Sequence, residues 1–211
     1  MIRIYGRASS RASRCLWVLE ELELPYEHVP LDYEKGEAQQ PEFLALNPSG
    51  KIPFMTDHAV HLSESMAIAL HIAETYGQGR LWPADRPDQA RCRQWAFWAV
   101  SELEPHAQAL LDEILFKPDP TQRNEQVLAR ARQKADAALA TLEAALAQRD
   151  VLVGEAFSVA DICVASVVKW LKGIKHDLTR FPHVSSWLAA SLNRPANQKV
   201  LGIKKSAAGA P

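Results

Sequence analysis

Residues 47–55 read Asn-Pro-Ser-Gly-Lys-Ile-Pro-Phe-Met, and residues 64–68 read Glu-Ser-Met-Ala-Ile. Asn-Pro-Ser-Gly is typical of a type I turn, with Pro at the second position and Gly at the fourth. Pro53 follows in a strand-like run, where it has no N–H for a ladder, so it marks a sheet edge or a special backbone position. Glu64 and Ser65 then open a helix, whose unpaired N–H groups and dipole favour an anion. Together these segments predict a pocket for a small carboxylate-bearing ligand that runs antiparallel along an exposed strand edge.

Composition excludes several classes of protein. The chain has 211 residues, 47% of them hydrophobic, and its 24 basic and 25 acidic residues give a formal net charge of −1. That balance is ordinary for a globular protein and argues against electrostatic binding of nucleic acid. No apolar run approaches the roughly 18 residues of a membrane span, and the N-terminus enters a strand pattern without the apolar region of a signal peptide. The cysteines at 15, 92 and 163 form no metal-ligand cluster, so we expect no metal site and free thiols in a reducing cytoplasm.

The chain divides into two regions of different character. The first alternates strand patterns with helical ones and ends at Gly77, an expected C′ cap. Strands are predicted at 2–5, 26–31, 52–56 and 60–62, and helices at 13–23, 41–46 and 64–76. Beyond a Gly- and Pro-containing stretch only helical patterns are strong, at 88–116, 121–148, 159–171 and 184–192, and Pro105 predicts a kink or break near Glu104. We therefore predict a thioredoxin-like domain at 1–78, a linker at 79–87 and an all-α domain at 88–211.

The runs at residues 47–55 and 64–68, taken together with the spacing between them, resemble those of a known family. The chain resembles the cytosolic glutathione S-transferase family, as a serine-type, bacterial-like member, from Ile2 to about Leu201. The resemblance implies the glutathione S-transferase fold, an α/β thioredoxin-like N-terminal domain followed by an all-α C-terminal helical domain. It also implies glutathione as co-substrate, a small hydrophobic electrophile as second substrate, a homodimer and a cytoplasmic location.

The loop at residues 6–14, Gly-Arg-Ala-Ser-Ser-Arg-Ala-Ser-Arg, follows the first predicted strand. In the family this loop supplies the group that hydrogen-bonds the glutathione sulfur and favours the thiolate. A free thiol has a pKa of roughly 8.5, and a donor aimed at the anion lowers it. The resemblance puts Ser9 at the catalytic position, or Ser10 if the loop is one residue shorter. Tyr5, Ser13 and the absence of any catalytic hydroxyl remain alternatives; by themselves Ser9 and Ser10 read as solvated loop residues.

The resemblance also assigns the residues that bind glutathione. Ile52 would offer its backbone N–H and C=O to the cysteinyl part in strand-addition mode, beside a cis peptide bond at Pro53. Glu64 and Ser65 would bind the γ-glutamyl end at the helix N-terminus, and Lys51 the glycyl carboxylate. Without the family, the same residues read as an edge-strand proline, helix caps and a solvated lysine.

One segment departs from the family pattern. Related chains often place a His or Lys before Pro-Glu-Phe to meet the glycyl carboxylate, whereas residues 36–41 here read Gly-Glu-Ala-Gln-Gln-Pro. Gln39 or Gln40 would give a neutral hydrogen bond instead. We therefore expect a modest affinity for glutathione, or a larger part for Lys51.

The helical region offers candidates for the second substrate. Its first long pattern is rich in aromatic rings, which would line an apolar cleft or belong to the core: Trp95, Phe97, Trp98, His106 and Phe116. Ser158 and Asp161 fit a capping pattern and are interpreted as fold determinants rather than catalysts.

Three functions are compatible with these residues. The leading one is a glutathione transferase that conjugates the thiolate to small apolar electrophiles. The second is a glutathione-dependent isomerase or peroxidase on the same site, although serine at positions 9 and 10 counts against thiol–disulfide exchange. The third is a non-catalytic, transferase-like binding module, which would typically have lost the loop hydroxyl or the Glu64–Ser65 pair.

Overall fold

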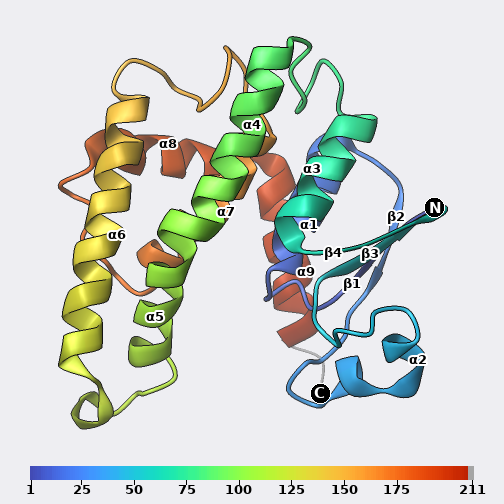
Figure 1. Ribbon diagram of the computed structural model, residues 1–211, viewed down its shortest axis with the longest axis horizontal. Coiled ribbons are helices and arrows are strands. Elements are labelled where there is room, and N and C mark those ends of the chain that lie inside the picture. The colour runs from blue at the N-terminus through green and yellow to red at the C-terminus, as the bar shows by residue number, and fades with distance from the viewer. Residues whose placement is uncertain (209–211) are drawn as a thin grey trace. The chain divides into compact units, whose positions relative to one another are not determined.

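The computed structural model describes residues 1–208. They form two compact units, of which the first comprises Met1–Ala84 together with the chain from Asn193 onward, and the second comprises Asp85–Leu192. Figure 1 shows that every strand belongs to the first unit, while the second is built from helices. This is the predicted succession of an α/β region and an all-α region.

The first unit is organised around a four-stranded mixed sheet in the order β2-β1-β3-β4. Strand β1 (Ile2–Tyr5) runs parallel to β2 (Tyr26–Val29) and antiparallel to β3 (Phe54–Asp57), which in turn pairs antiparallel with β4 (Val60–Ser63). A parallel pair needs a crossover, and α1 (Ala12–Leu22) supplies it. The predicted thioredoxin-like order of a βαβ unit, a hairpin and a helix is confirmed.

Two helices of the first unit pack against each other, α1 and α3 (Ser65–Tyr76). Helix α1 is buried on nearly every face, because all of its residues from Ala12 to Leu19 are buried. Gly77 caps the end of α3, where the sequence predicts the helix to stop, and its φ is −105°. It is needed for space, since a Cβ there would lie 2.8 Å from the carbonyl oxygen of Ala73.

Helix α9 (Pro195–Ala208) was not predicted, and it changes the expected domain boundary. The sequence predicts an all-α domain at 88–211, whereas α9 belongs to the first unit, against α1. The Arg194 guanidinium forks onto the Glu21 carboxylate with N–O distances of 2.7 and 2.8 Å. Such a bidentate pair joins residues far apart in the sequence, and no local pattern reveals it.

Short elements lead from β2 to β3. They are the 3-10 turn η1 (Glu37–Gln39) and α2 (Pro41–Leu44), which has Pro41 in its first turn as predicted. Strand β3 begins at Phe54 rather than at Ile52, because its pairing with β1 starts opposite Tyr5 and Pro53 has no N–H to donate.

The second unit is a helical bundle. Its helices are α4 (Arg86–Trp98), α5 (Glu104–Ile114), α6 (Glu125–Leu146), α7 (Val159–Gly173) and α8 (Pro182–Leu192), with a 3-10 turn η3 (Pro120–Gln122) before α6. The break expected near Glu104 takes the form of a π-helical turn, η2 (Ala99–Leu103), between α4 and α5.

The core of the second unit is α7. Every residue from Val159 to Val168 is buried, and α4, α5 and α8 pack against the helix. Its capping residue Asp161 accepts hydrogen bonds from Leu152 N, Trp187 Nε1, Ser158 N and Ser158 Oγ at 2.9 to 3.0 Å. The interpretation of Ser158 and Asp161 as fold determinants agrees with this network. Among the described helices, none is both long enough and apolar enough to cross a bilayer.

Candidate functional site

The register of the sheet brings the predicted site residues to one end of the first unit. Tyr5 lies opposite Phe54, and Phe54 lies opposite Ser63. The chain leaves β1 after Tyr5, enters β3 at Phe54 and leaves β4 after Ser63. The loop with Ser9, the segment 47–53 and the start of α3 therefore leave the sheet at the same end.

Close packing at Gly6 holds the loop that contains Ser9 against the segment 47–53. Gly6 has a φ of +128°, and a Cβ there would lie 3.1 Å from the Ile52 Cβ. Its N–H donates to the Val29 carbonyl at 2.9 Å, and its own carbonyl accepts from His28 Nε2 at 2.7 Å. Any larger residue would strain the backbone and push Ile52 away, so glycine holds the loop beside the strand edge.

The hydroxyls of Ser9 and Ser10 differ in their hydrogen bonding within the loop. The Ser10 hydroxyl donates to the Arg7 carbonyl at 2.7 Å and accepts from the Ala12 N–H at 3.1 Å, so its hydrogen is already used to shape the turn. Ser9 is exposed, and its hydroxyl has no hydrogen-bond partner within residues 1–208. Of these two, only Ser9 keeps a hydroxyl hydrogen for a ligand.

The other two candidate hydroxyls are less accessible. Ser13 is buried in the first turn of α1. The Tyr5 ring packs between Phe43 and Phe54, with centroid distances of 5.8 and 5.9 Å, and belongs to an aromatic cluster against the sheet. Ser9 is thus the most exposed of the four candidates.

The strand edge at Ile52 leaves backbone groups unpaired. The predicted turn is present, since the Gly50 N–H donates to the Asn47 carbonyl at 3.0 Å, and the buried Asn47 side chain donates to the Lys51 carbonyl at 2.8 Å. The Ile52–Pro53 peptide bond is cis, as the resemblance implied. In the described chain neither the N–H nor the C=O of Ile52 has a hydrogen-bond partner. Such an edge can accept one more antiparallel strand.

Gln39 and Lys51 differ in how many side-chain hydrogen-bond donors remain unused. Gln39 Nε2 donates to the Gly50 carbonyl at 2.9 Å, so one of its two amide hydrogens ties η1 to the turn before β3. Lys51 and Gln40 are exposed, and neither side chain has a polar partner among residues 1–208. The cation at Lys51 is the stronger candidate for meeting a carboxylate.

The N-terminus of α3 has the features of an anion-binding site. Glu64 stands at the N-cap with a φ of 68°, which is unusual for a residue with a side chain, and its carboxylate is exposed. Ser65 is the first helical residue and is only 6% exposed. Unpaired N–H groups and the helix dipole favour negative charge at this position.

Arg14 is the residue of this site that sequence reasoning missed as a functional candidate. It is 1% exposed on α1, and its Nη1 donates to the Ser65 hydroxyl oxygen at 2.9 Å. Because Ser65 accepts this bond from a cation, its own hydroxyl hydrogen remains to donate to a ligand. The available signal was a guanidinium placed among the buried residues of α1, directly before Cys15.

Together these groups offer an exposed helix N-terminus, a strand edge with unpaired backbone groups, an exposed lysine and an exposed serine hydroxyl at one end of the first unit. No cluster of His, Cys, Asp and Glu within residues 1–208 suits a metal ion.

The aromatic residues of the helical region differ in their contacts and in their exposure. The rings of Trp95 and Trp98 meet edge to face at 5.0 Å between centroids. Phe97 and Phe116 are 68% and 74% exposed, and His106 is half-buried.

Comparisons with known proteins agree with this geometry. Residues 2–74 match the model of the glutathione S-transferase N-terminal domain, and residues 125–190 match that of its C-terminal domain. The chain is 34% identical to glutathione S-transferase GstB of Escherichia coli, over 98% of this chain and all of the relative. It is also 34% identical to glutathione S-transferase 4 of Zea mays, over 100% of this chain and 96% of the relative.

A solved structure is similar along nearly the full length of the chain. A glutathione transferase from Phanerochaete chrysosporium, in complex with oxidized glutathione, superposes with a TM-score of 0.86 at 26% identity. The alignment covers 97% of this chain and 96% of that one.

Proposed function

The chain belongs to the glutathione S-transferase family, and from this premise we propose which of its residues carry out glutathione conjugation. It is a transferase that uses glutathione as co-substrate. The proposal assigns the thiol-activating role to Ser9. The observation that carries the assignment is the contrast in the loop, where the Ser10 hydrogen is donated to Arg7 and the Ser9 hydroxyl is exposed and unpaired.

The chemical role of Ser9 is to stabilise the thiolate. The Ser9 hydroxyl donates to the sulfur of bound glutathione, which favours the anion over the neutral thiol. The thiol gives its proton to solvent, and the thiolate forms a C–S bond with the electrophilic carbon. In a substitution the leaving group departs with the electron pair of its broken bond; in an addition the carbon–carbon π pair moves onto a conjugated carbonyl and takes up a proton from solvent. Lowering the thiol pKa by about two units corresponds to about 2.7 kcal/mol, which one charge-assisted hydrogen bond and the start of α1 can supply together.

The remainder of glutathione follows the exposed groups of the first unit. Its γ-glutamyl carboxylate is held by the N-terminus of α3 and the Ser65 hydroxyl, and its ammonium by Glu64. Its cysteinyl backbone pairs with Ile52, next to Pro53. Lys51 meets the glycyl carboxylate, with the second amide hydrogen of Gln39 as a neutral donor.

Steady-state kinetics of two alanine variants test the role of Ser9. We expect Ser9→Ala to leave the glutathione KM nearly unchanged, to lower kcat and to shift the pH–rate profile toward higher pH. Ser10→Ala is the matched control, because it removes the same hydroxyl from the next residue, and it should leave the profile in place. A shifted profile for Ser10→Ala and an unshifted one for Ser9→Ala would move the role to Ser10.

The second substrate is proposed to be a small apolar electrophile. A panel of aryl halides, unsaturated carbonyl compounds, peroxides and maleyl-type isomerisation substrates identifies the class. Turnover of peroxides or isomerisation substrates alone would favour the second function considered from the sequence.

A homodimer is proposed as the working assembly. Phe97 and Val100 expose apolar side chains close together on α4 and η2, and a stable interface buries more than roughly 1,000 Å². Light scattering at micromolar concentration should give twice the chain mass, and Phe97→Ser should lower it. Phe116→Ser, which removes another exposed ring, is the control. A monomer mass for the unmodified protein would refute the dimer.

A reducing, cytoplasmic location is proposed as well. All three cysteines are unbridged and buried, which suits a compartment that keeps thiols reduced. Cell fractionation with a marker enzyme tests this location, and recovery outside the cytoplasmic fraction would contradict it.

A further inference from the structure

The carbonyl of Gly6 is held by a side chain rather than by the backbone of the sheet. Gly6 begins the loop at residues 6–14, and its oxygen lies 2.7 Å from Nε2 of His28 on β2. Strand β2 ends at Val29, and no backbone N–H within residues 1–208 donates to this oxygen. We propose that His28 is a positioning residue for the loop hydroxyl that activates the thiol, an inference that rests on the role proposed for Ser9.

The chemistry of the contact fixes the direction of this hydrogen bond. A carbonyl oxygen can only accept, so the hydrogen must be on Nε2 of His28. Nδ1 of the neutral ring is then bare, and it has no hydrogen-bond partner in the described chain. Gly6 is buried and His28 is half-buried. A buried carbonyl that loses its donor is destabilising, so the ring has a defined task at this position.

Gly6 needs this restraint because its backbone is free to rotate. Its φ of +128° lies in a region that is open mainly to glycine. Its N–H is held by the Val29 carbonyl at 2.9 Å, which leaves rotation about the bond between Cα and the carbonyl carbon. That rotation would turn the planar peptide between Gly6 and Arg7 as one unit. The bond from His28 removes this remaining freedom, so β2 holds both polar backbone groups of Gly6.

The orientation of the peptide between Gly6 and Arg7 sets where the next turn begins. The Arg7 carbonyl accepts from the Ser10 N–H at 2.9 Å and from the Ser10 hydroxyl at 2.7 Å, and Ser9 is one of the central residues of this turn. Rotation of the peptide would carry the whole turn in a new direction and move the Ser9 hydroxyl away from the sulfur. His28 therefore acts on the thiol through the backbone.

A second tie to the loop is weaker than the one from His28. Arg7 Nη1 lies 3.1 Å from Asp32 Oδ1, but both side chains are partly exposed, so water screens the pair. This ion pair restrains a flexible side chain, whereas the bond from His28 restrains the peptide itself. The loop therefore depends more on His28.

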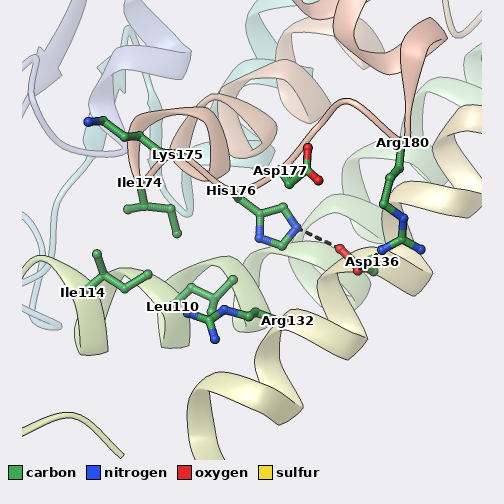
Figure 2. A pocket seen from close by; sticks show the side chains of 9 residues that line it. All are labelled: Leu110, Ile114, Arg132, Asp136, Ile174, Lys175, His176, Asp177 and Arg180. Carbon is green, nitrogen blue, oxygen red and sulfur yellow. Dashed lines mark hydrogen bonds and ion pairs between the residues drawn. The ribbon is translucent and has the colours of Figure 1, made fainter. Parts of the chain in front are cut away.

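Two other histidines hold carboxylates instead of backbone. Figure 2 shows the bond between His176 and Asp136, with 2.8 Å between Nε2 and the carboxylate oxygen. Nδ1 of His58 lies at the same distance from Asp57, its neighbour in the chain. Each of these contacts joins two side chains, so its loss would leave the backbone in place. His28 differs from them because its partner is the backbone of the loop.

Ultraviolet titration of the glutathione thiol on the enzyme, together with steady-state kinetics, tests the role of His28. His28→Leu removes the donor at similar volume. We expect it to raise the pKa of the bound thiol by up to about one unit and to lower kcat roughly three- to tenfold, the range for one neutral hydrogen bond. The glutathione KM should change less than kcat, because the proposed contacts to Ile52 and Ser65 remain. His28→Gln should restore both values, since its amide nitrogen lies the same number of bonds from Cα as Nε2.

His61→Leu is the matched control. His61 is exposed on β4, at the opposite edge of the sheet, and its ring has no hydrogen-bond partner within residues 1–208. This variant should keep the thiol pKa and the kcat of the unmodified protein. Thermal unfolding shows that each variant is folded. Nitrogen-15 NMR of the unmodified protein adds a measurement that needs no variant, and it should find the hydrogen of neutral His28 on Nε2.

Several results would overturn the proposal. They are an unchanged thiol pKa and kcat in folded His28→Leu, an equal change in His61→Leu, no recovery in His28→Gln, and a neutral His28 with its hydrogen on Nδ1. Ser9→Ala, titrated alongside, separates this proposal from the role of Ser9. If Ser9→Ala raises the thiol pKa and His28→Leu does not, the positioning role alone fails. If only His28→Leu raises it, the role of Ser9 fails and His28 positions another donor of the loop.

Discussion

Replacement of Ser65 by alanine tests the anion site at the start of α3 in two separable ways. The Ser65 oxygen accepts a hydrogen bond from the guanidinium of Arg14 at 2.9 Å, and both residues are almost fully buried. The variant removes that acceptor and also the hydroxyl that we propose to donate to the ligand carboxylate. We expect both the affinity for glutathione and the stability of the unliganded protein to fall.

The size of each effect follows from the contacts. A hydrogen bond to a charged group contributes about 1.5–3 kcal/mol, so loss of about 2 kcal/mol should weaken glutathione binding about 30-fold. The Arg14 N–H that loses its buried acceptor should cost about 1–3 kcal/mol in the free energy of unfolding. These values refer to different equilibria and are measured separately.

Calorimetric titration with glutathione gives the first value, and urea unfolding of the unliganded protein gives the second. Glu64→Gln is the comparison variant, because Glu64 is exposed and should affect binding with little effect on unfolding. If folded Ser65→Ala binds glutathione as tightly as the unmodified protein, the ligand carboxylate does not lie at this helix terminus. If its unfolding free energy is unchanged, the Arg14–Ser65 bond does not contribute to stability.

Three further predictions follow from buried groups. Asp161→Ala should lower the unfolding free energy by about 3 kcal/mol or more, because it leaves several buried donors without an acceptor; a loss below about 1 kcal/mol in urea unfolding would contradict this. Burial opposes ionisation of Asp57, but hydrogen bonds from Tyr76 and His58 outweigh it and hold its pKa below the ordinary value. The stabilisation of the fold by ionised Asp57 is therefore present above the unfolded pKa of about 3.9 and is lost as the pH falls through the folded pKa. The loss of unfolding free energy in Asp57→Asn should become smaller below about pH 4. A loss that stays constant with pH would refute the assignment. Burial also raises the pKa of Cys92 to about 11, and all three thiols are buried. The native protein should therefore react slowly with a thiol reagent at pH 8 and keep its conjugating activity. Rapid inactivation by the reagent would mean that a cysteine is needed for activity.

Local signals in the sequence accounted for the glutathione-binding half of the fold. The Asn47 turn, the start of α3 and the alternation of β1 each depend on residues close together in the chain. For this reason they could be recognised from spacing. The cis bond at Pro53 came from the family resemblance and not from local physics, which alone favours trans.

Long-range contacts account for what the sequence did not reveal. Helix α9 belongs to the first unit and is joined to α1 by Arg194 and Glu21, a pair without any periodic signature. Arg14 could be recognised as a partner of Ser65 only once α1 and α3 had been placed side by side. The choice between Ser9 and Ser10 depends on one turn of the loop, in which the Ser10 hydroxyl meets the Arg7 carbonyl.

The most direct test of the central claim is a titration of the glutathione thiol on the enzyme, followed by the ultraviolet absorbance of the thiolate. We expect a thiol pKa well below the roughly 8.5 of a free thiol when glutathione is bound to the unmodified protein. Ser9→Ala should raise that pKa toward the free value, while Ser10→Ala should leave it low. If Ser9→Ala leaves the pKa of the bound thiol unchanged, Ser9 does not activate the sulfur. The role would then pass to Ser10, Tyr5 or the backbone N–H groups at the start of α1.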